Sequence, residues 1–285
     1  MKANFEWNDY EILATGDGLK LERWKDVYLL RPDPQVIWKS KTDMNSYKNL
    51  HAKYNRIGGG GAWQTLKPMP DVWQISWRNL TFQIKPMGFK HTGLFPEQAV
   101  NWARMIDLIE KANRPIKVLN LFAYTGGATV ACTSAGAVVT HVDSAKNMVE
   151  VAKTNMKLSG LAEKPVRYIV DDCKKFVERE IRRGNKYDAI IMDPPSYGRG
   201  PTGEVWKIEE SLYELVELCK QILSDNPLFF LINSYTTGLQ PTVMKSIIAR
   251  AVEVKDLNKI DCYEVCLPTK EKIFLPCGCS AICEF

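Results

Sequence analysis

The strongest constraint on the fold of this chain is an alternation of strand-like and helix-like segments that begins near Val118. Short apolar runs alternate with longer stretches in which apolar residues recur with helical spacing. We expect strands at residues 118–122, 137–143, 166–170, 187–193 and 227–233, and two further strands near 260–267 and 278–284. We expect helices after Gly127 and at residues 144–158, 172–183, 209–223 and 242–252. This alternation predicts an α/β fold with a parallel sheet and crossover helices.

The front of the chain follows a different pattern, and we expect a small β-rich domain at residues 1–85 and a second domain at residues 86–285. Turn signals in the front segment separate strand-like runs, which read YLL, VIW, VWQISW and LTFQI. Four glycines at residues 58–61 fit an exposed hairpin tip better than a close approach to a ligand.

The net charge of +5 is concentrated in this front segment. Residues 1–85 hold 13 Lys and Arg against 9 Asp and Glu, whereas residues 116–285 hold 21 of each. Six of the eight tryptophans also lie at the front, so a basic and aromatic face for RNA is one interpretation. The alternative, which we favour for most of these tryptophans, is that they form the core of the β-rich domain.

The sequence shows no targeting or membrane-spanning pattern, and we expect a cytoplasmic protein that does not enter a membrane. Reduced thiols are then the expected state of the eight cysteines. The cysteines between residues 262 and 283 do not follow a common zinc-ligand spacing, and the alternating apolar residues around them favour buried thiols in strands over a metal site.

The carboxyl ends of the predicted strands carry residues suited to an adenosine ligand. The first strand ends in FAYTGGAT, whose glycines allow a close backbone approach but lack the GxGxxG pattern of a pyrophosphate site. Asp143 ends the second strand, where a carboxylate can accept both hydroxyls of a ribose. Asp172 and Cys173 follow the third strand and can read an adenine edge, although Asp172 is equally suited to cap a helix.

The fourth strand runs into DPPSYGRG, where two prolines restrict the loop that holds an acid and an aromatic ring. Asp193 and the carbonyls of Pro194 and Pro195 can accept hydrogen bonds from a nucleobase, and Tyr197 can stack on it. Arg199 lies close enough along the chain to contact a nucleic-acid phosphate. The alternative for Asp193 is a loop acid that only satisfies local amides.

Four segments together resemble a known family: FKHTGLFPEQ, VLNLFAYTGGATVAC, HVDSAKNMVEVAKTNMKLSGL and VDDCKKFVEREIRRGNKYDAIIMDPPSYGRG. Over about residues 86–285 the chain is similar to class I S-adenosylmethionine-dependent methyltransferases, in the group of bacterial 23S ribosomal RNA large-subunit enzymes. The resemblance implies a Rossmann-like sheet of seven strands, the last antiparallel, and S-adenosyl-L-methionine as cofactor.

The resemblance also assigns roles to individual positions. The methionine part of the cofactor would lie over Phe122, Ala123, Tyr124, Thr125 and Gly126. Asp143 would hold the ribose with Ser144 and Asn147 close by, Asp172 and Cys173 would flank the adenine, and a loop with Thr92, Phe95 and Gln98 would close over the cofactor.

One departure from the family narrows the chemistry. Relatives that methylate carbon 5 of cytosine carry a cysteine nucleophile after the fifth strand, in a run resembling SCSCSGL. Here the run is NSYTTGL, with Ser234 and Thr236 at the cysteine positions, and hydroxyls are far poorer nucleophiles than a thiolate.

We therefore predict methylation of a base nitrogen in ribosomal RNA without a covalent intermediate, with Asp193, Pro194, Pro195 and Tyr197 at the catalytic position. The alternatives are a carbon-5 cytosine RNA methyltransferase, a nicotinamide-dependent oxidoreductase and a non-catalytic RNA-binding protein. The missing GxGxxG argues against the oxidoreductase. The sequence does not indicate an oligomeric state.

Overall fold

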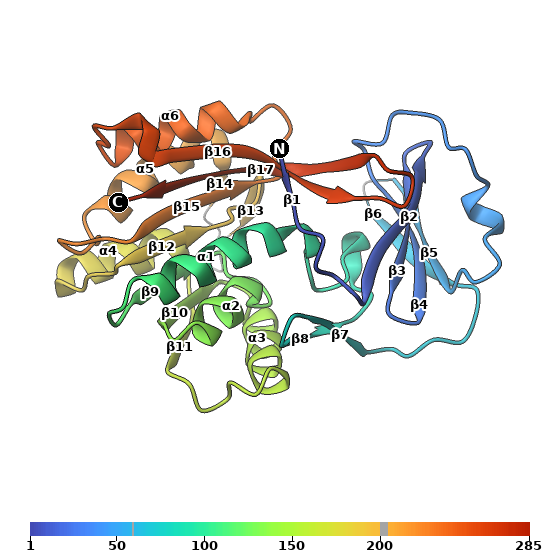
Figure 1. The fold of residues 1–285 in the computed structure, drawn as a ribbon, viewed down its shortest axis with the longest axis horizontal. Helices are drawn as coiled ribbons and strands as arrows, with labels where there is room; N and C mark the ends of the chain where they lie inside the picture. Colours follow the sequence, from blue (N-terminus) through green and yellow to red (C-terminus); the bar gives the residue numbers. More distant parts are fainter. Residues whose placement is uncertain (59, 200–204) are drawn as a thin grey trace. The chain divides into compact units, whose positions relative to one another are not determined.

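The computed structural model describes residues 1–58, 60–199 and 205–285, except the side chains of Phe89 and Arg199. Contacts along the chain divide it into two compact units, which are drawn in Figure 1. We call residues 101–265 and 278–285, with Met1, the sheet unit, and residues 2–100 and 266–277 the front unit.

A mostly parallel sheet forms the centre of the sheet unit. Its strands are β9 (Lys117–Leu121), β10 (Val138–Asp143), β11 (Val166–Val170), β12 (Ala189–Met192), β15 (Phe229–Ser234), β16 (Ile260–Pro268) and β17 (Phe274–Glu284). Their order is β16-β17-β15-β12-β9-β10-β11. The strands from β15 to β11 pair in parallel, and β17 pairs antiparallel with β15. The predicted sheet with an antiparallel last strand is confirmed.

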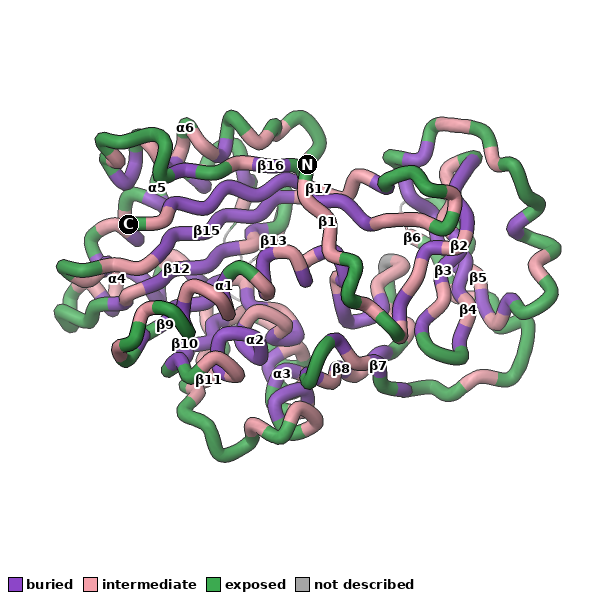
Figure 2. Tube along the Cα trace, viewed as in Figure 1, coloured by how far each residue is buried: buried purple, intermediate pink, exposed green. Residues whose placement is uncertain are grey.

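The helices of this unit cover both faces of the sheet. They are α1 (Ala99–Lys111), α2 (Gly127–Ser134), α3 (Lys146–Leu158), α4 (Cys173–Arg183), α5 (Ile208–Lys220) and α6 (Pro241–Ala251), with a short 3₁₀ turn η4 (Leu257–Lys259). Leu119 and Leu121 of β9 belong to the core formed with α4, α5 and α6. Asn120, which points to the opposite face, donates a hydrogen bond to Thr129 of α2 at 3.0 Å. The central strands β9, β10, β12 and β15 are almost entirely buried, whereas the edge strand β11 is partly exposed along its length (Figure 2).

Two elements of the sheet unit were absent from our expectation. Helix α1 buries Trp102, Met105 and Ile109, whose spacing of three and four residues is a helical signal already present in the sequence. A small hairpin also follows β12, formed by β13 (Tyr197–Arg199) and β14 (Val205–Lys207). No helix in the described part of the chain is both long and apolar enough to cross a membrane.

The front unit is rich in strands, as predicted. A five-stranded sheet contains β2 (Tyr10–Gly16), β3 (Leu19–Trp24), β4 (Val27–Pro32), β5 (Ala52–Ile57) and β6 (Gly60–Thr65), in that order, and β7 (Trp73–Trp77) pairs with β8 (Leu80–Ile84). The remaining elements are 3₁₀ turns, η1 (Met44–Ser46), η2 (Gly88–Lys90) and η3 (Pro96–Gln98).

The turn between β2 and β3 explains why one of the expected strands does not form. Asp17 and Gly18 both adopt positive φ, 51° and 78°, which is the geometry of a tight hairpin between β2 and β3. The VIW run at residues 36–38 is not a strand, because the carbonyls of Val36 and Trp38 accept hydrogen bonds from the β2–β3 turn. The glycines at residues 58, 60 and 61 lie at and after the β5–β6 turn, and Gly59 lies outside the described residues.

The front tryptophans serve the interior of the unit, as favoured above. Trp24, Trp73 and Trp77 are buried, and Trp7, Trp38 and Trp63 are partly buried. Five of the six indole N–H groups donate to a partner within the unit, for example Trp63 to the carbonyl of Met87 at 2.7 Å. These rings therefore offer little surface for stacking on a nucleobase.

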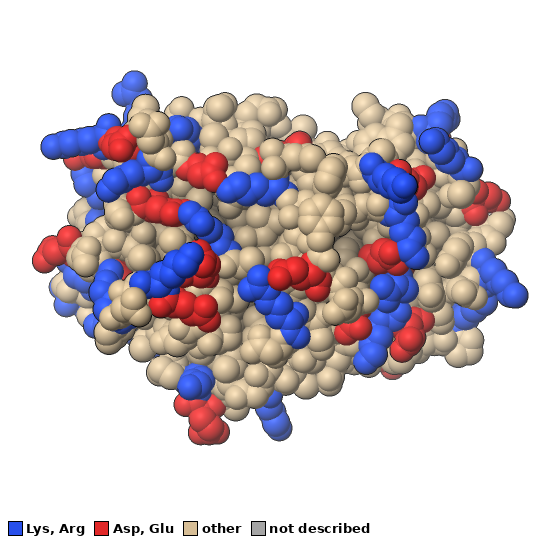
Figure 3. All heavy atoms as spheres, viewed as in Figure 1, with Lys and Arg blue, Asp and Glu red and all other residues tan. Residues whose placement is uncertain are grey.

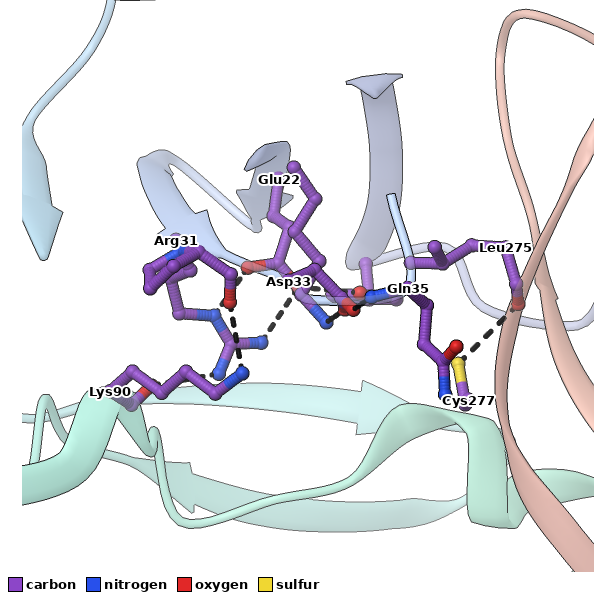
Figure 4. A network of polar contacts seen from close by, with 10 residues as sticks. Glu22, Arg31, Asp33, Gln35, Lys90, Leu275 and Cys277 are labelled. Atoms are coloured by element: carbon purple, nitrogen blue, oxygen red, sulfur yellow. Dashed lines mark hydrogen bonds and ion pairs between the residues drawn. The ribbon is translucent and has the colours of Figure 1, made fainter. Parts of the chain in front are cut away.

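A buried ion pair connects the neighbouring strands β3 and β4 (Figure 4). Arg31 donates to both carboxylate oxygens of Glu22, at 2.5 and 2.7 Å, and Tyr10 donates to the same carboxylate at 2.7 Å. Burial alone would raise the pKa of Glu22, but the charges of Arg31 and Lys20 and its hydrogen bonds outweigh burial and lower the pKa to about 2. Removing one partner leaves the other charge buried and unpaired.

We predict that Arg31→Met lowers the free energy of unfolding of the front unit by about 3–5 kcal/mol, because Glu22 loses its bidentate partner. Tryptophan fluorescence during chemical denaturation measures this, since six of the eight tryptophans lie in the front unit. Lys39→Met, which removes an exposed cation 3.1 Å from Asp17, is the control and should leave the stability nearly unchanged.

The same comparison depends on pH in a defined direction. Because the folded pKa of Glu22 lies below its usual 4.5, the ion pair contributes fully above about pH 4.5 and its contribution is lost as the pH falls towards 2. The stability difference between wild type and Arg31→Met should therefore shrink across that interval. A difference that stays constant from pH 6 to pH 2 contradicts this assignment.

Candidate active site

Asp143, at the end of β10, connects two of the loops at the carboxyl edge of the sheet. Its Oδ2 accepts the backbone N–H of Tyr124 at 2.8 Å, and its Oδ1 accepts that of Ala145 at 2.8 Å. Burial raises the pKa of Asp143, and these two hydrogen bonds oppose that rise. A carboxylate can accept about four hydrogen bonds, so further acceptor positions remain for a ligand.

The glycine-containing loop after β9 is shaped by backbone geometry that few residues adopt. Gly126 has φ 80° and precedes α2, and a Cβ there would lie 2.8 Å from the Cβ of Ala152 in α3. Phe122 and Tyr124 also have positive φ, 53° and 49°, which is unusual for residues with large side chains. Such conformations are held only by surrounding contacts and are frequent at ligand sites.

Asn155 is a site residue that the sequence analysis missed. It is fully buried in α3, and its amide donates a 2.8 Å hydrogen bond to the carbonyl of Thr125. This hydrogen bond fixes the middle of the loop after β9. A buried Asn in an otherwise apolar helical face was the available signal.

Asp172 and Cys173 stand where β11 gives way to α4. Asp172 caps α4 by accepting the N–H of Lys175 at 2.9 Å, so the capping alternative is correct, and the cap leaves carboxylate positions for a ligand. The buried thiol of Cys173 accepts the N–H of Phe122 at 3.3 Å, which ties this strand end to the β9 loop. Burial raises the pKa of Cys173 well above its usual range.

A cavity of about 400 Å³ opens among these strand ends. Its lining residues include six of the predicted positions, Phe122, Asp143, Ser144, Asp172, Cys173 and Pro195. The other lining residues are Lys174, Lys175, Glu178, Gly198, Val205, Trp206 and Ser211. Trp206 packs against Phe122 with ring centroids 5.0 Å apart, so β14 contributes an aromatic wall that the sequence did not reveal.

Several predicted positions support this region without lining the cavity. Ala123, Tyr124, Thr125 and Gly126 form the β9 loop itself, and Ala123 donates its N–H to the carbonyl of Val142 at 3.0 Å. Asn147 is exposed on the first turn of α3 and is not a lining residue.

The loop after β12 places Asp193 beside the end of β15. Met192 of β12 is paired with Ile232 of β15. Asn233 follows Ile232, and its side-chain amide donates a 2.8 Å hydrogen bond to Oδ1 of Asp193. Pro194 is buried, whereas Pro195 lines the cavity. The carbonyl of Pro195 accepts the indole N–H of Trp206 at 2.6 Å.

The residues that follow the two prolines, Ser196 and Tyr197, are exposed. Tyr197, at the start of β13, is 53% exposed. The hydroxyl of Ser196 lies 2.6 Å from that of Thr236, and this contact joins the DPPSY loop to the loop after β15. The side chain of Arg199 and the whole of Gly200 lie outside the described residues.

At the two positions where carbon-5 enzymes carry cysteine, this protein has hydroxyl side chains that already form hydrogen bonds. Ser234 is buried and accepts the N–H of Thr236 at 3.1 Å. The thiol beside this loop, Cys279, donates to the carbonyl of Leu239, and burial raises its pKa to about 11. No group of three His, Cys, Asp or Glu in the described part of the chain is arranged to hold a metal ion.

Thr92, Phe95 and Gln98 belong to the front unit. Thr92 is fully buried, and its hydroxyl has no hydrogen-bond partner among the described residues. Phe95 and Gln98 are partly buried; Phe95 precedes η3 and Gln98 is its last residue. Their contact with the cofactor stays a prediction.

Comparisons with known proteins agree with this geometry. A family model for S-adenosylmethionine-dependent methyltransferases matches residues 42–245. A crystal structure of an S-adenosylmethionine-dependent methyltransferase from Agrobacterium tumefaciens is 32% identical, with a TM-score of 0.91 over 99% of this chain and 92% of that one.

Two curated relatives are named as ribosomal RNA enzymes. Ribosomal RNA large subunit methyltransferase K of Neisseria meningitidis is 23% identical over 86% of this chain and 70% of its own length. Methyltransferase K/L of Desulfotalea psychrophila is 28% identical over 73% of this chain, which spans only 27% of that longer protein.

The family match covers more than two thirds of the chain, and the strand order, the cavity at the carboxyl ends of the strands and the Agrobacterium structure agree with it. This chain belongs to the S-adenosylmethionine-dependent methyltransferases, and S-adenosyl-L-methionine is its cofactor.

Proposed function

We propose that this enzyme methylates a nitrogen of a nucleobase in ribosomal RNA, without a covalent protein–RNA intermediate. The observation that carries the proposal is the placement of Asp193 directly after β12. Its carboxylate is oriented by Asn233 of β15, and Pro195, two residues further on, lines the cavity. A ribosomal RNA substrate is supported by the names of the relatives from Neisseria and Desulfotalea, and it would place the enzyme in the cytoplasm.

The residues around the cavity fit S-adenosylmethionine. Asp143 lines the cavity with acceptor positions beyond the two that backbone N–H groups occupy, as a ribose requires. Asp172, which offers an acceptor, and Cys173 line the cavity where we expect the adenine, and Phe122 lines it where we expect the methionine part. We propose that these residues, Ser144 and the β9 loop hold the cofactor. Asn147 and the front segment with Thr92, Phe95 and Gln98 would make additional contacts with the cofactor.

The cofactor, when bound, supplies a methyl group on a sulfonium with a good leaving group. What the protein must then add is in-line positioning of the acceptor and removal of its proton. Asp193 accepts a hydrogen bond from the N–H of the target base and takes up the proton as the base is methylated. The carbonyl of Pro194 and the exposed ring of Tyr197 hold the base in place, while the Pro195 carbonyl is already paired with Trp206.

Carbon-5 methylation of cytosine is the weaker candidate, because it requires a thiolate nucleophile. Ser234 and Thr236 replace the family cysteines, and Ser234 is buried. The nearby thiols are protonated at neutral pH, since burial raises the pKa of Cys173 and of Cys279.

We further propose that the first 85 residues bind RNA while residues 86–285 carry the methyltransferase activity. Because the front tryptophans are engaged in the interior, the electrostatic attraction would come from basic side chains. Lys39, Lys41 and Lys48 are exposed on the long connection between β4 and β5. On the face drawn in Figure 3, basic and acidic side chains are interspersed, so we expect moderate, salt-sensitive binding.

Asp143→Ala should weaken binding of S-adenosylhomocysteine by about tenfold to a hundredfold, since a hydrogen bond to a charged group contributes roughly 1.5–3 kcal/mol. Isothermal titration calorimetry measures this. Asp188→Ala is the matched control, because Asp188 also accepts several hydrogen bonds but sits at the start of β12, at the opposite edge. Unchanged affinity in a folded Asp143→Ala protein would show that the ribose assignment is wrong.

Asp193→Asn should lower the single-turnover rate by about 10²–10⁴, the usual contribution of a positioned acid-base group, while S-adenosylhomocysteine affinity is retained. The assay follows transfer of a labelled methyl group to ribosomal RNA from cells that lack the enzyme. Asp225→Asn, an exposed acid before β15, should keep the wild-type rate. If Asp193→Asn lowers only thermal stability and not the rate per folded molecule, Asp193 is a structural acid.

Changing Lys39, Lys41 and Lys48 together to Gln should weaken binding of ribosomal RNA and reduce the magnitude of its log–log salt slope by about 2, given roughly 0.7 per lost phosphate contact on single strands. Fluorescence anisotropy at several salt concentrations gives the slope. The control triple Lys164, Lys255 and Lys259 to Gln removes exposed charge from the sheet unit. Equal effects of the two triples would argue against a special role for the front domain.

A further inference from the structure

We propose that four buried side chains of the sheet unit, Tyr263, Asn101, Ser280 and Asn233, form one directional hydrogen-bond chain that ends on Asp193 and positions its carboxylate. The inference rests on the proposed function of Asp193 and assigns positioning roles to residues that do not line the cavity.

The hydrogen-bond chain runs without a break from Tyr263 to the candidate catalytic acid, Asp193. The Tyr263 hydroxyl donates to Oδ1 of Asn101 at 2.7 Å, and Nδ2 of Asn101 donates to Oγ of Ser280 at 3.0 Å. The Ser280 hydroxyl then donates to Oδ1 of Asn233 at 2.7 Å, and Nδ2 of Asn233 donates to Oδ1 of Asp193 at 2.8 Å.

All four donors in this chain point the same way, and the chemistry of its end requires that direction. An ionised carboxylate only accepts hydrogen bonds, so Asn233 must turn its NH₂ group towards Asp193 and its carbonyl towards Ser280. Ser280 has a single proton, which goes to that carbonyl, and it therefore accepts from Asn101. Aligned hydrogen bonds polarise one another, and this effect is larger in a low-dielectric interior.

The fold brings the chain together from four separate elements. Asn233 in β15 and Ser280 in β17 are direct partners across the antiparallel pair, Asn101 comes from the first turn of α1, and Tyr263 comes from β16. The four side chains are 0–4% exposed. Burying four polar side chains costs free energy unless each is hydrogen-bonded. Apolar side chains at the same positions would pack as well, so packing alone does not explain the polar ones.

The first donor of the chain stays protonated at neutral pH. Burial raises the pKa of Tyr263, and the charges of Asp261 and Glu284 add to the rise, while that of Arg104 opposes it. Asp193 and Tyr263 are the titratable members of the chain. Between them, the amides and the hydroxyl transmit orientation without taking up or releasing a proton.

The test is the pKa of Asp193, measured by ¹³C NMR titration of carboxyl-labelled aspartate with the signal assigned through Asp193→Asn. Asn233→Leu removes the last donor, and the pKa of Asp193 should rise by about one to two units, because a hydrogen bond to the charged form is lost. Tyr263→Phe removes the first donor, and we expect a smaller rise in the same direction.

Tyr187→Phe is the matched control. Tyr187 is also buried, and its hydroxyl donates to Glu180 at 2.7 Å, away from the chain. It should lose stability like Tyr263→Phe but leave the pKa of Asp193 unchanged. If Tyr263→Phe and the control give the same Asp193 pKa as wild type, the chain does not extend to its first member.

The outcomes separate this inference from the proposed function. An Asp193 pKa unaffected by Asn233→Leu, with turnover still lost in Asp193→Asn, overturns the hydrogen-bond chain alone. Full turnover in Asp193→Asn overturns the catalytic role of Asp193, whatever the pKa does. The chain is supported when the pKa rises in Asn233→Leu, turnover falls and affinity for S-adenosylhomocysteine is retained.

Discussion

The site depends first on the carboxylate of Asp143, which holds the loops after β9 and β10 in one arrangement. One oxygen binds the N–H of Tyr124 and the other that of Ala145. This contact supports the unusual backbone of Phe122 and Tyr124, and the thiol of Cys173 adds the strand end at α4. Asp143 thus orders two strand ends around the cavity, and its remaining acceptor positions suit the ribose proposed for it.

Asp193 is held in a contrasting way. Its partner Asn233 comes from the neighbouring strand β15, and that residue is fixed in turn by Ser280 across the antiparallel pair with β17. The antiparallel strand that distinguishes this sheet from a purely parallel one therefore has a local consequence. It brings a hydroxyl to the point where the candidate catalytic acid needs an oriented amide.

The sequence was sufficient for the parallel core because its strands are short apolar runs that end in polar residues at one edge. The acids at residues 143, 172 and 193 could be found for that reason. The sequence did not reveal the roles of Asn155, of Trp206 or of the hydrogen-bond chain that leads to Asn233. These roles arise from contacts between segments distant in sequence. The VIW run failed because its carbonyls pair with a turn rather than a strand.

The most direct measurement is mass spectrometry of nucleosides from ribosomal RNA of cells that lack this gene, compared with the same cells carrying wild-type enzyme or Asp193→Asn. The account predicts that one N-methylated nucleoside is missing without the gene, returns with the wild-type enzyme, and remains missing or strongly reduced with Asp193→Asn. Loss of 5-methylcytidine, or an unchanged set of modified nucleosides, would contradict non-covalent methylation of a base nitrogen in ribosomal RNA.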